Sequence, residues 1–385
     1  PLNKDEYWRF MAPANFTSEK SANGLQSNRD SPYFSKEKDS INIYFEDGKL
    51  NESVSDLDKL SGIEIVSLGD KEKLNIEWVQ NLYGALEESS QIKVKRGLAA
   101  YNTACSQNGL LIRVVNSEEK IIIINYLGEK PNSDCLLHHI IKMENGSRIT
   151  IIEQGEGCSR LNKVVEVDIG VKAELNHLRF FGADRKAHVL TQTFVRQATE
   201  SVYREFAFTL NNEFVRNEFY ISLEGEKAQV SLAGASLGEK NNIQDDTIFI
   251  AHLKPSCESR QVFKKVLKDG STGVFQGKIF VSAEAQKTDG YQISKALLLG
   301  SESKFLTKPE LEIYADDVIC SHGSTCGAID EESLFYLTSR GVSRNEATGM
   351  LVLAFLDEAI QEIADEKLAL KVRNIFISQL EPNLE

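Results

Sequence analysis

The sequence lacks the cysteine patterns that indicate a zinc site, a dithiol redox site or a disulfide-rich fold. It contains only six cysteines in 385 residues, at positions 105, 135, 158, 257, 320 and 326. None of them forms a C-x-x-C pair, and their spacing is wide and irregular. Sparse, unpatterned cysteines are typical of a reducing compartment, so we expect a cytoplasmic protein.

Positive charge is scarce as well. The chain has 57 acidic against 44 basic residues, for a net charge of −13. Proteins that bind nucleic acid or anionic membranes need a basic surface, so neither partner is expected. Residues 1–5 contain no apolar signal core, and the aliphatic run at 121–124 is far shorter than a transmembrane helix. The sequence therefore predicts no membrane segment.

Motifs for nucleotides and common metals are also missing. The sequence has no H-E-x-x-H pair and no EF-hand loop. The nearest approach to a phosphate-binding loop is Gly273–Ile279, where the two glycines stand one residue too close together. Ile279 occupies the place of the hydroxyl residue that would hold magnesium. The alternating pattern predicts a strand, and we expect no ATP site in this chain.

The composition that remains is that of a globular protein, and it changes twice along the chain. Hydrophobic residues make up 41% and charged residues 26%, which predicts a sizeable core. Residues 1–100 form an N-terminal helical and irregular region. Within it, the Ser-, Asn- and Asp-rich stretch 18–60 predicts loop, and apolar residues at helical spacing from 74 to 86 predict a helix.

Residues 101–328 predict a mainly β core. Short runs rich in β-branched and aromatic residues recur there, separated by Gly, Asn and Asp, without a long helical pattern. Many short strands indicate a sandwich, a barrel or a β-solenoid. The number of strands favours a solenoid, in which each coil covers its neighbour, although no clean sequence repeat is visible.

Residues 329–385 predict helices. Asp330 is the expected N-cap of the first, and Ser343 opens the second with a capping box. The second helix contains the apolar run Met350–Leu356, which is nearly two turns long and so has no polar face. Such a helix is either enclosed in its own core or docks one side on a partner, and the sequence leaves both open.

One short segment combines two ligand types. Cys320 and His322 follow a strand-like run, and residues two apart on a strand face the same way. Thiolate and imidazole suit iron–sulfur chemistry, although spacing alone favours a buried structural cysteine. Cys326 would share that face on a continuous strand. Gly323 and Gly327 instead suggest a bend, so Cys326 is expected to pack rather than to ligate.

The segment from His252 to Arg340 resembles the SufB/SufD family of iron–sulfur cluster assembly scaffold proteins. The matching elements occur in this order: His252-Leu253-Lys254-Pro255 with Cys257, Ser259 and Gln261, Val274-Phe275-Gln276-Gly277-Lys278-Ile279, Ala285-Gln286-Lys287-Thr288-Asp289, Lys295-Ala296-Leu297-Leu298-Leu299, Pro309-Glu310-Leu311-Glu312-Ile313-Tyr314-Ala315-Asp316-Asp317-Val318, Cys320-Ser321-His322-Gly323, Asp330-Glu331-Glu332-Ser333-Leu334-Phe335-Tyr336-Leu337 and Arg340-Gly341. Ser321, where SufB-type chains usually carry Glu, makes the chain similar to the SufD type. Ser324 and Cys326 depart from that type, which leaves open whether Cys326 adds a reactive thiol.

The resemblance implies a right-handed parallel β-helix over residues 101–328 with helical segments on both sides. It implies pairing with a SufB-like scaffold through the β-helix ends, and leaves open a homodimer when the chain is isolated. A SufC-like ABC ATPase would bind the C-terminal helical domain, 329–385. The expected contacts with that ATPase are Leu334, Met350, Leu351 and Phe355.

The resemblance also implies a role without catalysis. ATP-driven closure of the ATPase subunits would strain the paired scaffolds and open their interface. Cys320 and His322 would lie there, where a transient iron–sulfur cluster could be shared with a SufB cysteine. His322 is the expected ligand and Cys320 a helper.

Two other functions compete with this interpretation. An extracytoplasmic β-helix enzyme acting on carbohydrate needs paired carboxylates or a base in a cleft. The obvious pair here is Asp316-Asp317, but neighbours on a strand face opposite ways. The other competitor is an adaptor that touches no metal, which an unchanged cluster yield after mutation of His322 would favour.

Overall fold

The computed structural model describes residues 6–17, 33–34, 40–57, 61–70, 75–91, 94–116, 120–128, 130, 133–182, 186–210 and 212–380. Much of the stretch 18–39, predicted as loop, lies outside the described residues, as does Leu74 of the predicted helix. Among the described residues, no helix is long and apolar enough to cross a membrane.

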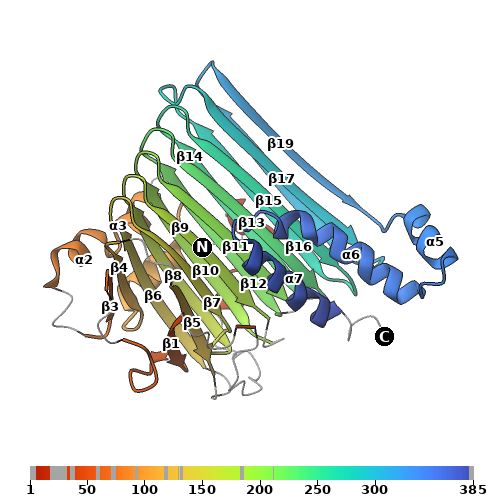
Figure 1. The fold of residues 1–385 in the computed structure, drawn as a ribbon, viewed down its shortest axis with the longest axis horizontal. Helices are drawn as coiled ribbons and strands as arrows, with labels where there is room; N and C mark the ends of the chain where they lie inside the picture. The colour runs from red at the N-terminus through yellow and green to blue at the C-terminus, as the bar shows by residue number, and fades with distance from the viewer. Residues whose placement is uncertain are drawn as a thin grey trace.

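Long strands make up most of the chain (Figure 1). Three precede the core: β1 (Ser40–Glu46), β2 (Lys49–Leu50) and β3 (Ile63–Ser67). The strands that follow are β4 (Leu110–Val114), β5 (Ile121–Leu127), β6 (Asp134–Met143), β7 (Arg148–Gln154), β8 (Arg160–Ile169), β9 (Glu174–Phe181), β10 (His188–Gln197), β11 (Val202–Leu210), β12 (Phe214–Leu223), β13 (Gln229–Gly238), β14 (Ile243–His252), β15 (Glu258–Leu267), β16 (Thr272–Val281), β17 (Thr288–Leu298), β18 (Lys304–Ile313) and β19 (Val318–Gly327).

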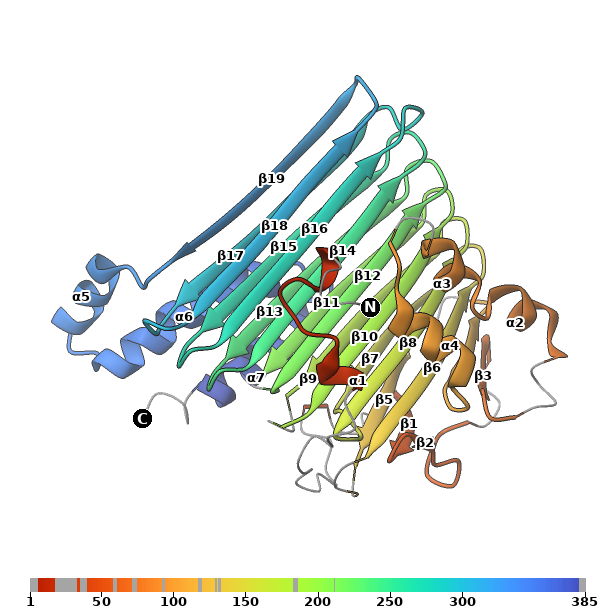
Figure 2. The same cartoon turned by 180° about the vertical axis from the view of Figure 1, so that it is seen from behind.

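The strands form two facing sheets, parallel except for the antiparallel pairs β1–β2 and β3–β4 at one end. One has the order β19-β17-β15-β13-β11-β9-β7-β5-β1-β2, and the other β18-β16-β14-β12-β10-β8-β6-β4-β3. From β4 onward, consecutive strands alternate between them, so the chain winds as a solenoid (Figures 1 and 2). The predicted mainly β, parallel β-helix architecture is confirmed. The stretch Gly273–Ile279 lies inside β16, as its alternation predicts.

Two local predictions in the N-terminal region are wrong. Ser40–Glu46 is a strand rather than loop, because Ile41, Ile43 and Phe45 bury their side chains in the lumen beside β5. The single helix predicted from 74 to 86 is two, α2 (Glu77–Leu82) and α3 (Ala85–Ser90). Gly84 separates them with a positive φ of 75°, a conformation that favours glycine and ends a helix.

Helices cover the outer faces of the two sheets. The nine-stranded sheet carries η1 (Glu6–Trp8), α1 (Ala14–Thr17), α3 and α4 (Gly97–Cys105) on its outer side (Figure 2). On the outer side of the ten-stranded sheet lie α6 (Arg344–Ile360) and α7 (Glu366–Leu380), which follow α5 (Glu331–Ser339). The predicted caps are confirmed. Asp330 accepts the amide of Ser333 at 3.0 Å, and Ser343 accepts that of Glu346 at 3.2 Å.

The lumen holds charged groups as well as apolar ones. Glu153 is buried and accepts hydrogen bonds from Lys163, from Tyr126 at 2.5 Å and from His177 at 2.7 Å. Burial alone would raise the pKa of the Glu153 carboxyl, but Lys163 and His177 hold it well below its usual range. The carboxylate is therefore the ionised centre of a fully buried network.

Two buried histidines should make stability depend on pH. Burial lowers the pKa of His139 to about 3 and that of His252 to about 4. In the unfolded chain such rings take up a proton near pH 6.5, whereas the folded protein keeps them neutral to about pH 4. The stability they contribute is therefore complete above about pH 6.5 and is lost as the pH falls toward 4. The loss is on the order of 3 kcal/mol for each histidine.

Chemical denaturation at pH 7 and at pH 4.5 measures this dependence. His252→Asn should reduce the difference in unfolding free energy between the two pH values by about 2–3 kcal/mol. Gln244 is buried on β14, the strand of His252, and has no titratable group, so Gln244→Asn serves as a control that should leave the difference nearly unchanged. An equal pH dependence in wild type and His252→Asn would contradict the assignment.

Candidate functional site

The C-terminal end of the solenoid leaves two strand edges without a neighbour in the described chain. There, β18 pairs only with β16, and β19 only with β17. Figure 1 shows β19 as the outermost strand, and Figure 2 shows β18 beside it at the same end. Ile319 and Tyr314 are 75% and 62% exposed at this end. Unpaired backbone groups flanked by exposed apolar side chains are a ready template for pairing with another chain.

Cys320 and His322 both lie on β19 and face the same way, as predicted. Cys320 stands next to Gly290 of β17 in register, and His322 stands next to Gln292. Cys320 packs against a cluster that includes Ile279 of the opposite sheet, so this is the face that looks into the lumen. The strand brings the predicted thiol and imidazole together at the open end.

The bend predicted at Gly323 and Gly327 is absent, and Cys326 shares the face of Cys320. β19 runs without interruption because β17 is long enough to pair with both glycines, through Ile293 and Leu297. Six residues on a strand span about 20 Å, so Cys320 and Cys326 cannot hold the same small cluster. Cys326 is exposed and is therefore not a packing residue, contrary to the prediction.

The Cys320 thiol is not preset as a thiolate. It is half-buried, and burial raises its pKa; the amide of Gly290 lowers it slightly and the charge of Asp289 raises it further. The thiolate is the form that binds metal. Binding of a metal by Cys320 would therefore have to displace the thiol proton.

The ligand set in the described part of this chain is incomplete. No group of three or more His, Cys, Asp or Glu side chains comes together in a way that could hold a metal ion among the described residues. Cys320 and His322 are two residues apart, about 7 Å along the strand, and provide two ligands at most. Iron–sulfur clusters usually take four protein ligands. A cluster held here would need the others from a second chain.

The four predicted ATPase contacts occupy different environments. Met350 is 50% exposed on α6, whereas Leu334 is 2% exposed on α5, the helix that contacts α6. Leu351 and Phe355 are partly buried, and the Lys264 ammonium lies 4.7 Å from the centre of the Phe355 ring. A partner helix could reach Met350 directly, but Leu334 could act only by supporting the α5–α6 contact.

One side of the apolar run on α6 is enclosed in the protein's own core, and docking of its other side stays a prediction. Val352 and Leu356 pack against Val262 and Val266 on the outer face of β15. Met350 lies outside this contact and is exposed. Helix α5 adds two exposed aromatic residues that sequence reasoning missed, Phe335 at 74% and Tyr336 at 56%. The sequence did contain a signal for their exposure. Both follow Leu334 directly on α5, and only one side of that short helix can face the core.

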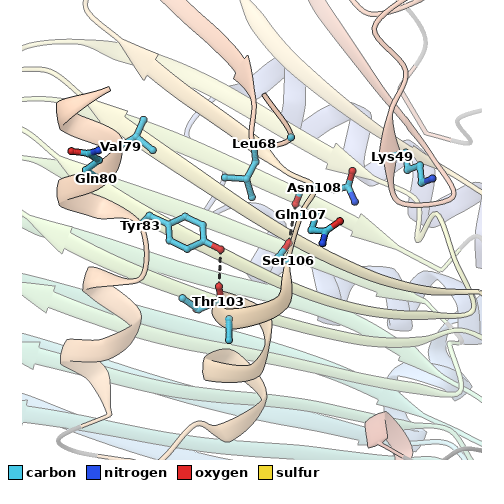
Figure 3. A pocket seen from close by; sticks show the side chains of 11 residues that line it. Lys49, Leu68, Val79, Gln80, Tyr83, Thr103, Ser106, Gln107 and Asn108 are labelled. Atoms are coloured by element: carbon cyan, nitrogen blue, oxygen red, sulfur yellow. Dashed lines mark hydrogen bonds between the residues drawn. The ribbon is translucent and has the colours of Figure 1, made fainter. Parts of the chain in front are cut away.

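A pocket of about 840 Å³ lies at the other end of the solenoid (Figure 3). It lies between α2, α4 and the first strands, where the Tyr83 hydroxyl donates to the carbonyl of Thr103 at 2.7 Å. Its lining residues are Lys49, Leu68, Gly69, Val79, Gln80, Tyr83, Thr103, Ala104, Ser106, Gln107 and Asn108. None of these carries a carboxylate, and Asp316 and Asp317 lie exposed in the connection from β18 to β19. The pocket therefore offers no acid pair for glycoside chemistry.

Comparison with known proteins finds relatives in one family. Residues 126–355 match the family described as SUF system FeS cluster assembly, SufBD core domain. The chain is 30% identical over 343 residues to the iron–sulfur cluster assembly protein SufD of Escherichia coli, covering 87% of this chain and 78% of that protein. It is also 28% identical over 236 residues to an iron–sulfur cluster assembly SufBD family protein of Synechocystis, with 58% of this chain and 52% of that protein covered.

Proposed function

Because the chain belongs to the SufB/SufD family of iron–sulfur cluster assembly proteins, we propose that it is a scaffold subunit without catalytic activity of its own. It pairs with a SufB-like chain and docks a SufC-like ABC ATPase. In this proposal residues 101–328 carry the pairing surface, residues 329–385 bind the ATPase, and residues 1–100 form the N-terminal helical and irregular region. A transient cluster is shared between the two scaffolds at His322 and Cys320.

The observation that carries the proposal is the coincidence of an open sheet end with a half-complete ligand set. The edges of β18 and β19 have room for strands of a second scaffold, and His322 and Cys320 lie beside those edges. A partner strand that pairs here would bring its own side chains next to them. Interface formation and ligand assembly are then the same event, which suits a cluster that must be built and released.

Movement of the interface would follow from where the ATPase docks. The exposed Met350 side of α6 faces away from the solenoid, and the helix is tied to the sheet by ion pairs of Glu358 with Lys264 and Lys295. Lys295 lies on β17 in register with Thr325 of β19. Closure of two ATPase subunits would therefore pull on the strands next to the pairing edge.

Replacement of His322 tests the shared site. In a complex co-expressed with SufB-like and SufC-like subunits, His322→Ala should lower the bound iron and acid-labile sulfide about tenfold or more, because an exposed ligand is lost. The mass of the complex should not change. Cys105→Ser is the matched control, because Cys105 is exposed on α4 at the far end. An unchanged cluster yield in His322→Ala would support an adaptor that touches no metal.

A further inference from the structure

A row of two buried glutamines leads through the lumen to His322. Gln261 on β15 is in register with Gln292 on β17, which is in register with His322 on β19. Both glutamines are fully buried, and the Gln292 Nε2 donates to the Gln261 Oε1 at 2.9 Å. The amides therefore form a ladder that runs along the solenoid axis toward the open end.

The last rung of this ladder is unsatisfied. The Gln292 Oε1 is buried and has no hydrogen-bond partner among the described residues. Because the Nε2 side of the amide is directed at β15, the oxygen side is directed at β19. Gly277 on the opposite sheet makes room for this amide, since a Cβ there would lie 2.2 Å from the Gln292 Nε2. The amide fits only because that position has no side chain.

We propose that Gln292 is a positioning residue for His322, and that its amide oxygen accepts a ring N–H of that histidine. The role of His322 as a ligand rests on the proposed function, whereas the hydrogen bond between Gln292 and His322 does not. Parallel neighbours in register are about 4.8 Å apart, so an exposed His322 ring that turns inward reaches the oxygen.

The bond would prepare the ring as a ligand. A neutral imidazole carries its proton on one nitrogen and a lone pair on the other. When the Gln292 oxygen holds the N–H, the second nitrogen keeps the lone pair and points away from the amide, toward the pairing edge. Ligating histidines commonly donate their other N–H to a carbonyl, which fixes the tautomer and the ring orientation. Gln292 would do this before any metal arrives.

Long-range ¹H–¹⁵N spectra of the histidine rings in the full chain test the bond without any partner or cluster. The chain has only six histidines, and the His322 signals are identified by their loss in His322→Ala. A ring N–H held by Gln292 should be protected from exchange with water and give a resolved signal. Gln292→Leu, which keeps the shape but removes the acceptor, should lose it.

Two further variants make the result specific. Gln292→Glu can reproduce both interactions when its carboxyl is protonated, and should retain the signal. Ser294→Ala removes a different lumen contact on the same strand, the 3.0 Å bond to Ser324, and should also retain it. If Gln292→Leu fails to fold, the other proteins still decide. The proposal is overturned if wild type shows no protected His322 signal, or if Gln292→Glu and Ser294→Ala both lose that signal.

Bound iron in the co-expressed complex separates this inference from the function on which it rests. Gln292→Leu should lower the iron content about tenfold while the subunit composition stays the same. Should His322→Ala leave the iron unchanged, the shared cluster site is refuted, yet the protected N–H would still establish the positioning bond. A protected signal that survives in Gln292→Leu overturns the positioning role even if His322 proves to be a ligand.

Discussion

Glu153→Ala is expected to lower the free energy of unfolding by about 3–5 kcal/mol, the usual result of removing one partner from a buried ion pair. The Glu153 carboxylate is 1% exposed and accepts hydrogen bonds from Lys163, Tyr126 and His177. The alanine variant would leave the Lys163 ammonium in the lumen without a counter-charge. Denaturant titration followed by circular dichroism measures the change.

Two variants show whether the charge is responsible. Glu144→Ala breaks a partly exposed pair with Arg113 (2.7 Å) and should cost less than about 1 kcal/mol. Glu153→Leu combined with Lys163→Met removes both charges and should recover most of the lost stability. If Glu153→Ala costs no more than Glu144→Ala, the lumen network does not have the ionised form described above.

Met350→Asp should weaken binding of the ATPase subunit at least about 30-fold, which corresponds to about 2 kcal/mol. The proposed docking surface consists of Met350 on α6 with Phe335 and Tyr336 on α5, all at least half exposed. A carboxylate at its centre would lose its hydration on binding without gaining a partner. Surface plasmon resonance with the immobilised ATPase subunit measures the effect.

The matched control for this variant lies on the opposite face of the solenoid. Tyr101 is 53% exposed on α4, which covers the nine-stranded sheet, whereas α6 covers the ten-stranded one. Tyr101→Asp should leave the affinity within about twofold of wild type. Equal weakening by the two variants, or none by Met350→Asp, would place the ATPase elsewhere on the chain.

The parts of the fold that local chemistry decides could be predicted from the sequence. Asp330 and Ser343 cap their helices as expected, because a capping side chain bonds to amides only three residues away. The strand-rich core was recognisable from turn residues and β-branched runs. The shared face of Cys320 and His322 followed from the two-residue period of a strand.

The parts that depend on register could not be predicted in this way. Glu153 meets His177, 24 residues along the chain, because β7 and β9 of successive coils pair side by side. It meets Lys163, 10 residues along, because β7 and β8 face each other across the lumen. Ser40–Glu46 was assigned to loop because its neighbours are polar, while its burial comes from β5, far along the sequence. The row of Gln261, Gln292 and His322 left only a weak trace in the sequence. Gln261, Gln292 and His322 follow one another at intervals close to one coil, but the coil length is known only once the register is fixed.

The mass of the assembly tests the scaffold role most directly. The chain would be co-expressed with SufB-like and SufC-like subunits from the same organism, and the purified complex measured by multi-angle light scattering. We expect one species that contains all three subunits, and its separation into smaller species in Ile319→Asp, which places a charge at the open end formed by β18 and β19. Val54→Asp, an equally drastic change in an exposed loop near the opposite end, should leave the mass unchanged. A chain that elutes alone beside both subunits would contradict the scaffold role.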